Sequence, residues 1–171
     1  MEEQTNTTTT RAGLRYGLIF GLISIINMLV VNMTNMEKPL GFIAWVIGIA
    51  MIVMAMLYFR SNNGGLMRYG QGVSTGMAAS GVSSVMGSFF FFIYIRFIDT
   101  GYIKKLLENT RTELEKNPDL SDDQVNATLE MSSKFMTPEL MFIFGLIISL
   151  IFGLVISLIV AAILKKENKE F

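Results

Sequence analysis

The sequence contains no cysteine and no histidine. These two absences exclude disulfides, thiolate nucleophiles, Ser-His-Asp triads, and the zinc or haem sites that need sulfur or imidazole. Charge is also scarce, since charged residues make up 16% of the chain, whereas soluble domains carry about 25%. We therefore expect no enzyme, no cofactor, and no catalytic or metal-binding residues.

The few charges are balanced, with 14 Lys and Arg residues against 14 Asp and Glu residues. A chain without a basic excess has no general attraction for phosphates, so we expect no nucleic-acid partner. Hydrophobic residues make up 51% of the chain, and its mean hydropathy is +0.49. They lie in four long blocks instead of at amphipathic spacing. Such blocks indicate that the main partner of this chain is the lipid bilayer.

Each block is long enough to cross a membrane, because a spanning helix needs roughly 20 apolar residues. The first block is too long for a cleaved signal peptide, and another block follows it closely. The sequence thus predicts an all-α membrane protein with four transmembrane helices. We expect a disordered tail at 1–13, a membrane domain at 14–164 with spans at 14–33, 41–59, 73–98 and 140–164, and a second tail at 165–171.

Basic residues in the short polar segments predict the orientation, because positive charge resists transfer across a membrane. The long segment 99–139 is acidic, with nine Asp and Glu residues against five Lys and Arg residues. We expect this segment outside the cell membrane and both termini in the cytoplasm. Seven basic residues share the predicted cytoplasmic side: Arg11, Arg15, Arg60, Arg68, Lys165, Lys166 and Lys169.

The segment 99–139 has the pattern of an extramembrane amphipathic helical hairpin. From Tyr102 onward apolar residues recur on one helical face until Pro118 breaks the pattern. Ser121 followed by Gln124 matches a capping box at the start of a second helix. We read the acidic residues as a solvated face. The alternative is a cation site, without the glycine turn and terminal glutamate of a calcium loop, at Asp119, Asp122 and Asp123.

Small residues recur every four positions in three of the spans. In lipid, helices associate through close van der Waals approach, so such rows mark contact faces. The serines could instead line a pore, but they can bond to carbonyls of their own helix, and no ring of charges accompanies them. We favour packing. The rows are Gly13, Gly17 and Gly21; Gly72, Gly76, Ser80, Ser84 and Ser88; and Gly145, Ser149, Gly153, Ser157 and Ala161.

Two strongly polar side chains stand in or beside the apolar blocks. Asn27 lies deep in the first span, where an amide more often ties two helices together than binds a ligand. Arg96 lies among aromatic residues at the end of the third span, and we expect it to reach the lipid headgroups. The alternative for Arg96 is a gating or substrate-binding charge.

Several short motifs follow one another along the chain: Asn62-Asn63-Gly64-Gly65, Tyr69-Gly70, Phe97-Ile98-Asp99, Phe135-Met136-Thr137-Pro138 and Ala161-Ala162-Ile163-Leu164-Lys165-Lys166. Their order and spacing carry a family resemblance. From Arg15 to Lys166 the chain resembles the bacterial membrane family known as domain of unknown function 4199. The resemblance implies a four-span protein of a Gram-negative inner membrane, which would make segment 99–139 periplasmic, and it implies no activity or cofactor.

Three functional hypotheses follow from these features. We favour a non-enzymatic assembly or accessory protein that binds a second copy of itself or another membrane protein through the small-residue rows and the hairpin. The main alternative is a small transporter or channel subunit, suggested by the serines of the third span. A membrane enzyme would need outer carboxylates such as Asp99 and Glu139, and their spacing does not single out a pair.

Overall fold

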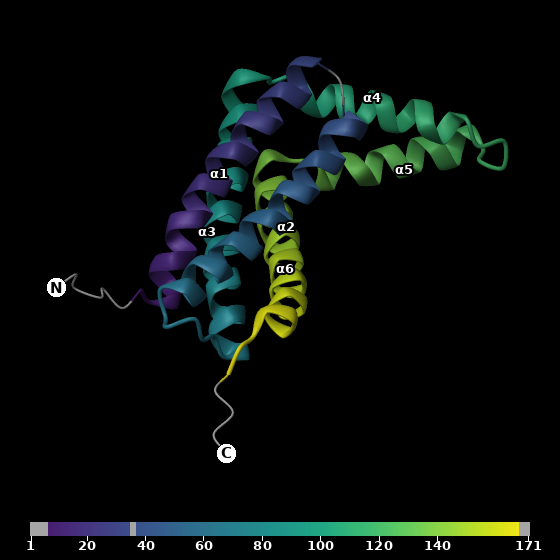
Figure 1. Ribbon diagram of the computed structural model, residues 1–171. Coiled ribbons are helices and arrows are strands. Elements are labelled where there is room, and N and C mark those ends of the chain that lie inside the picture. Colours follow the sequence, from purple (N-terminus) through teal and green to yellow (C-terminus); the bar gives the residue numbers. More distant parts are fainter. Residues whose placement is uncertain (1–6, 35–36, 168–171) are drawn as a thin grey trace. The chain divides into compact units, whose positions relative to one another are not determined.

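The computed structural model describes residues 7–34 and 37–167. Within these ranges the chain forms helices, loops and one isolated bridge, which confirms the predicted all-α fold. Figure 1 shows the helices in chain order. They are α1 (Thr9–Thr34), α2 (Glu37–Ser61), α3 (Tyr69–Ile93), the π-helical segment η1 (Tyr94–Ile98), α4 (Tyr102–Glu115), α5 (Asp122–Phe135) and α6 (Pro138–Leu164).

Four helices are long and apolar enough to cross a membrane, as the sequence predicts. Their outward side chains are large and apolar; Leu22, Ile148 and Ile163, for example, are 56%, 65% and 74% exposed. Such a surface is unfavourable in water and favourable in hydrocarbon. The four stretches are Thr9–Thr34, Phe42–Ser61, Tyr69–Ile98 and Pro138–Leu164.

The first helix begins earlier than the sequence predicts. The expected disordered tail extends to residue 13, but α1 begins at Thr9. The Thr8 hydroxyl accepts a hydrogen bond from the backbone N–H of Arg11 at 3.2 Å, and Ala12 and Gly13 are buried. Tertiary contacts of these small residues therefore extend the helix beyond the apolar block. The rest of the two expected tails, 1–6 and 168–171, lies outside the described residues.

Contacts divide the chain into two units. The bundle unit comprises residues 1–87 and 146–171, and the hairpin unit comprises residues 88–145. The core of the bundle unit draws buried side chains from α1, α2, α6 and the loop before α3, and the partly buried Val73 of α3 packs against it. Its buried members are Ala12, Ile52, Met56, Phe59, Met67, Val160 and Ala161.

Aromatic side chains hold α2 to its neighbours in the bundle unit. The rings of Tyr16 and Tyr58 join α1 to α2, with centroids 5.5 Å apart. The Arg15 guanidinium lies 4.9 Å from the Tyr58 ring centroid, and its Nη1 donates to the Tyr58 hydroxyl at 3.0 Å. On the opposite side, Trp45 of α2 meets Phe152 of α6 edge-on at 4.1 Å. These contacts place α2 between α1 and α6.

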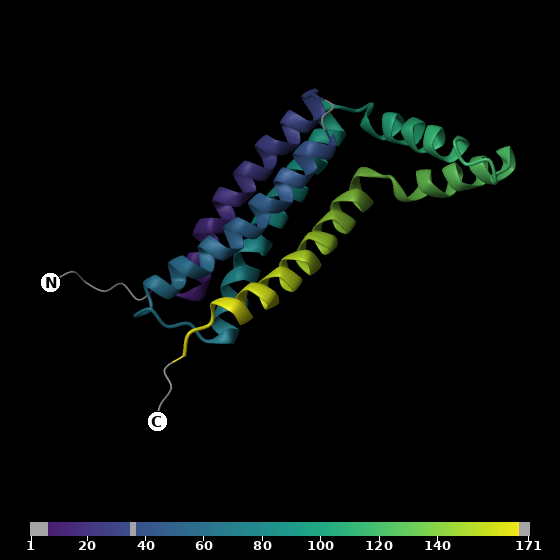
Figure 2. The same ribbon diagram turned by 45° about the vertical axis from the view of Figure 1, so that its right-hand side comes forward.

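The hairpin unit begins within α3 and ends within α6, and α4 and α5 lie between them. Both helices run side by side in opposite directions (Figures 1 and 2). Val125 of α5 is buried, at 3% exposed. The predicted capping box is present, because the Ser121 hydroxyl accepts from the Gln124 N–H and the Gln124 side chain accepts from the Ser121 N–H. Local sequence therefore determines where α5 begins.

Candidate functional site

The small-residue rows of α3 and α6 meet each other in an antiparallel register. Gly72 lies against Ala161, Gly76 against Ser157, and Ser80 against Gly153. Each step of four residues forward on α3 matches a step of four residues back on α6. Residues four apart lie on the same face of a helix, so one face of α3 contacts one face of α6. The same register appears in the hairpin unit, where a Cβ on Gly145 would lie 3.6 Å from the Ser88 Oγ. These rows are contact faces, as predicted, and we call this contact the α3–α6 seam.

The seam is too close for side chains at its glycines. A Cβ on Gly76 would lie 2.8 Å from the Ser157 Cβ and 2.8 Å from the Met56 Cε. A Cβ on Gly153 would lie 2.5 Å from the Ser80 Oγ. Ordinary carbon contacts are about 3.5 to 4.0 Å long, so only glycine fits at either position.

The third row, on α1, contacts α3 in the same manner. A Cβ on Gly17 would lie 2.7 Å from the Ala79 carbonyl oxygen, and one on Gly21 would lie 2.8 Å from the Met86 Sδ. Gly13 packs in the same way, one turn earlier, against the Thr75 carbonyl. All three rows are thus used to pack helices of one chain. This use removes them as surfaces for binding a second copy.

Two hydroxyls within the seam have no hydrogen-bond partner. Ser83 donates to the Ser80 carbonyl at 3.0 Å and Thr75 to the Gln71 carbonyl at 2.8 Å, which is the back-bonding expected from the sequence. The Ser80 and Ser157 hydroxyls are 3% and 0% exposed by residue, and they are the only buried side-chain N or O atoms without a partner in the part of the chain described. Each lies against the glycine of the facing helix.

The polar residues beyond the C-terminal end of α3 form separate ion pairs. Arg96 lies in η1, and its Nη1 is 3.6 Å from the Glu139 Oε1. Asp99 instead pairs with Lys105, at 3.3 Å between carboxylate and ammonium. The two carboxylates considered for catalysis therefore each have a different basic partner. The sequence did not predict η1, which the Asp99 N–H closes by donating to the Tyr94 carbonyl at 2.8 Å.

Asn27 does not form the predicted tie between helices. Its side chain is half-buried and makes no hydrogen bond within residues 7–34 and 37–167. The amide that does bond on this helix is Asn32, which donates to the Met28 carbonyl of its own helix at 2.8 Å. A polar residue inside an apolar block was therefore a poor guide to which helices meet.

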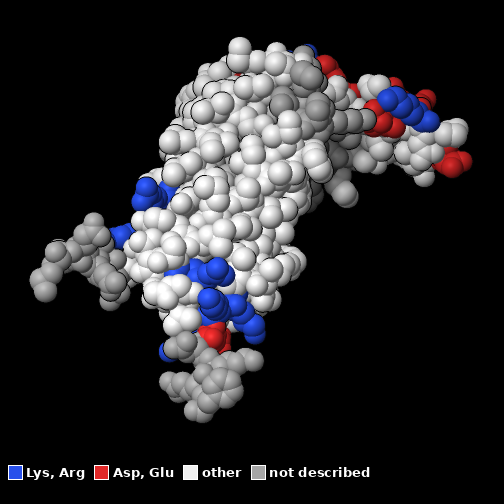
Figure 3. All heavy atoms as spheres, viewed as in Figure 1, with Lys and Arg blue, Asp and Glu red and all other residues white. Residues whose placement is uncertain are grey.

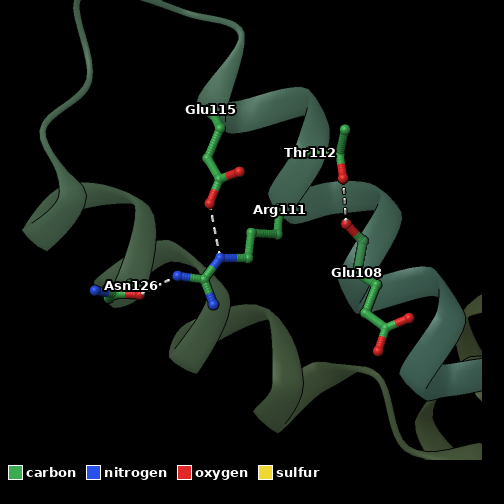
Figure 4. Close-up of polar contacts among 5 residues, drawn as sticks. All are labelled: Glu108, Arg111, Thr112, Glu115 and Asn126. Carbon is green, nitrogen blue, oxygen red and sulfur yellow. Dashed lines mark hydrogen bonds and ion pairs between the residues drawn. The ribbon is translucent and has the colours of Figure 1, made fainter.

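Ion pairs cover most of the charge on the hairpin helices. In Figure 4, Arg111 of α4 reaches Glu115 at 2.8 Å and Asn126 of α5 at 3.4 Å, so it links the two helices. Each of the other four basic side chains of 99–139 also has an acidic partner. Three carboxylates of segment 99–139 have no ion pair within the described residues, and they are the candidate cation ligands Asp119, Asp122 and Asp123.

These three carboxylates do not converge on a metal site. No group of three or more His, Cys, Asp or Glu side chains among the described residues is placed to hold a metal ion. Asp122 and Asp123 lie instead in the first turn of α5, where negative charge is favourable beside the exposed N–H groups of the helix. The arrangement explains these acids as helix-terminal residues.

Together these features define a class of protein: an all-α chain with four helices able to cross a membrane, closed by seams of small residues. The chain belongs to the family described as protein of unknown function (DUF4199), whose model matches residues 15–166. That match confirms the family expected from the short motifs. No curated protein and no solved structure matches the chain.

Proposed function

We propose that this chain is a non-enzymatic assembly or accessory protein of a bacterial inner membrane, and that α5 of the hairpin is its contact surface. The observation that carries the proposal is a pair of large apolar side chains on α5. Met131 is 65% exposed and Phe135 is 56% exposed, although the hairpin is otherwise rich in charge. The two residues are four positions apart, so they share one helical face.

This spacing is typical of a helix that inserts apolar anchors into a groove of a partner. Burying one such side chain is worth roughly 1.5 to 3 kcal/mol, so both side chains are suited to act as anchors within a larger contact. The small-residue rows are occupied within the chain, which leaves the hairpin as the surface for assembly. The proposal includes the predicted topology, with the hairpin in the periplasm and both termini in the cytoplasm.

The proposal is tested by placing a photo-crosslinking amino acid at Phe135 in cells that make the full chain. We expect one discrete protein adduct, whose mass distinguishes a second 19.1 kDa copy from another membrane protein. The matched control carries the same amino acid at Ser133, an exposed residue on the opposite face of α5. Equal adducts from both positions, or adducts only with lipid, would refute a specific contact surface at Phe135.

The unpartnered hydroxyls of Ser80 and Ser157 favour a second candidate, a small transporter or channel subunit. A polar path would form if α3 and α6 separated along the seam, because both hydroxyls would then face water. A Ser157→Cys variant decides between the two candidates. If the chain is an assembly protein, a hydrophilic thiol reagent should leave Ser157→Cys unmodified in membranes. The same reagent should also leave the control Ile159→Cys unmodified, because that residue faces lipid. Modification of Ser157→Cys alone would favour the transporter.

A further inference from the structure

Two segments far apart in the sequence are joined by backbone hydrogen bonds at one end of the bundle unit. The backbone N–H of Met67 donates to the Lys166 carbonyl, and the N–H of Lys166 donates to the Met67 carbonyl, both at 2.9 Å. Met67 is 0% exposed, so this isolated bridge is anchored in the core. The Arg60 Nη1 also donates to the Leu164 carbonyl at 3.2 Å. The loop between α2 and α3 is thereby fixed to the segment that follows α6.

This bridge brings together basic side chains that have no acidic partner. Arg68 follows Met67 in the sequence, Lys165 precedes Lys166, and Arg60 bonds to the residue before Lys165. None of these four takes part in an ion pair within the residues that the structure describes. The hairpin differs, since every basic residue there has an acid. Like charges held together repel one another, so the cluster favours an anion.

Further basic residues lie at the same end of the bundle unit. Arg11 and Arg15 belong to the first turns of α1. Figure 3 shows Lys and Arg atoms gathered at the lower end of this unit, with few acidic atoms among them. The Arg15 side chain is engaged with Tyr58, whereas Arg60, Arg68, Lys165 and Lys166 lie in or beside the bridged segments.

We propose that Arg60, Arg68, Lys165 and Lys166 bind the phosphate of an anionic phospholipid headgroup. Guanidinium and ammonium groups bind phosphate oxygens through charge-assisted hydrogen bonds. The cluster lies where α2 and α6 end and α3 begins, which is the level of the headgroups for helices that span the bilayer. A general preference for positive charge on one side explains basic residues there. It does not explain why two distant segments are bonded through their backbones beside those charges.

The experiment uses the purified full chain in detergent. We expect phosphatidylglycerol to raise the midpoint of thermal unfolding, whereas phosphatidylcholine and inorganic phosphate at the same concentration should not. The double variant Arg68→Gln, Lys165→Gln should bind phosphatidylglycerol about thirtyfold more weakly. Each basic residue near an anionic lipid surface raises the affinity about fivefold, and the variant removes two of them. Each variant is compared with its own lipid-free sample, and native mass spectrometry counts the bound lipids independently.

The matched control is the double variant Arg111→Gln, Lys134→Gln, which removes two basic residues that are paired with acids on the hairpin. This variant should retain the phosphatidylglycerol shift and the bound lipid. An equal loss in both double variants would overturn the proposal, because binding would then follow total charge. No loss in either would also overturn it, because binding would then not depend on Arg68 and Lys165. A shift as large with inorganic phosphate would also overturn it, since the site would then take a free anion.

Discussion

At the scale of single residues, this fold depends on side chains that are absent. Gly76 and Gly153 lie where a methyl group would overlap the facing helix, and each is opposed by a serine of that helix. Helices within a bilayer gain little from apolar burial, because lipid is as apolar as the side chains. Close backbone approach is therefore the main source of their attraction. We expect glycine substitutions in the seam to cost more than their small volume suggests.

The Gly76→Ala variant should lower the stability of the chain. The new Cβ would lie within 3 Å of the Ser157 Cβ and the Met56 Cε, and overpacking of this kind costs about 1 to 3 kcal/mol. Thermal unfolding in detergent measures the loss. Gly87→Ala on the same helix is the control, because a Cβ there meets nothing within 4 Å and alanine favours helix. Equal midpoints for the two variants would show that α3 and α6 are not in close contact.

The Ser157→Ala variant should be as stable as the original chain, or slightly more stable. Removing a buried hydroxyl that has no partner also removes the cost of keeping it from water. The same thermal measurement applies, with Ser80→Ala as a second case of an unpartnered hydroxyl. A clear drop in both midpoints would mean that these hydroxyls have a partner, and the transporter reading would gain support.

At the scale of elements, the hairpin helices are stabilised by local signals and the long helices by tertiary contacts. The helix α5 begins at a reciprocal cap between Ser121 and Gln124, and its first turn carries Asp122 and Asp123. Most ion pairs of the hairpin are between exposed side chains on one helix, which contribute little each. The cap is therefore the stronger determinant of where α5 begins.

The Ser121→Ala variant should loosen the first turn of α5. Losing a serine cap costs about 1 kcal/mol, which corresponds to about fivefold faster hydrogen exchange in that turn. Exchange measured by mass spectrometry on peptides from this region reports the change. Ser133→Ala is the control, since its exposed hydroxyl only bonds back to the Glu130 carbonyl. Equal exchange in the two variants would contradict the role of the cap.

The sequence predicted those features of each element that depend on local patterns. Four-residue spacing of small residues identified the contact faces of α1, α3 and α6, and the cap identified the start of α5. Which row meets which depends on the packing of distant segments, so the pairing of Gly76 with Ser157 could not be read in advance. The start of α1 at Thr9 was missed for the same reason, because it depends on contacts of Gly13 with α3.

The bridge between Met67 and Lys166 was also beyond prediction from the sequence. Both residues lie in short polar segments without a periodic pattern, and nothing local pairs a loop with the end of the chain. The π-helical segment η1 was missed because it differs from an α-helix only in that its N–H groups bond to the carbonyl five residues back instead of four. Features of this kind arise from tertiary contacts. The bridge adjoins the basic cluster, and η1 contains Arg96 of the Arg96–Glu139 ion pair.

At the scale of the whole molecule, the proposed topology requires the four long helices to cross a membrane. Each stretch is apolar and at least 20 residues long, which is the length that a spanning helix needs. An even number of crossings returns the chain to its starting side. The turn between α2 and α3, which includes Asn62, should then lie on the opposite side from the hairpin that includes Ser121.

Cysteine accessibility tests this claim most directly, because the chain has no cysteine and each introduced thiol is unique. An impermeant thiol reagent should label Ser121→Cys in intact spheroplasts, and it should label Asn62→Cys only after the membrane is ruptured. The reverse pattern would keep the spans and invert the orientation. Labelling of both residues in intact spheroplasts, at equal rates, would show that α3 does not carry the chain across the membrane and would contradict the account.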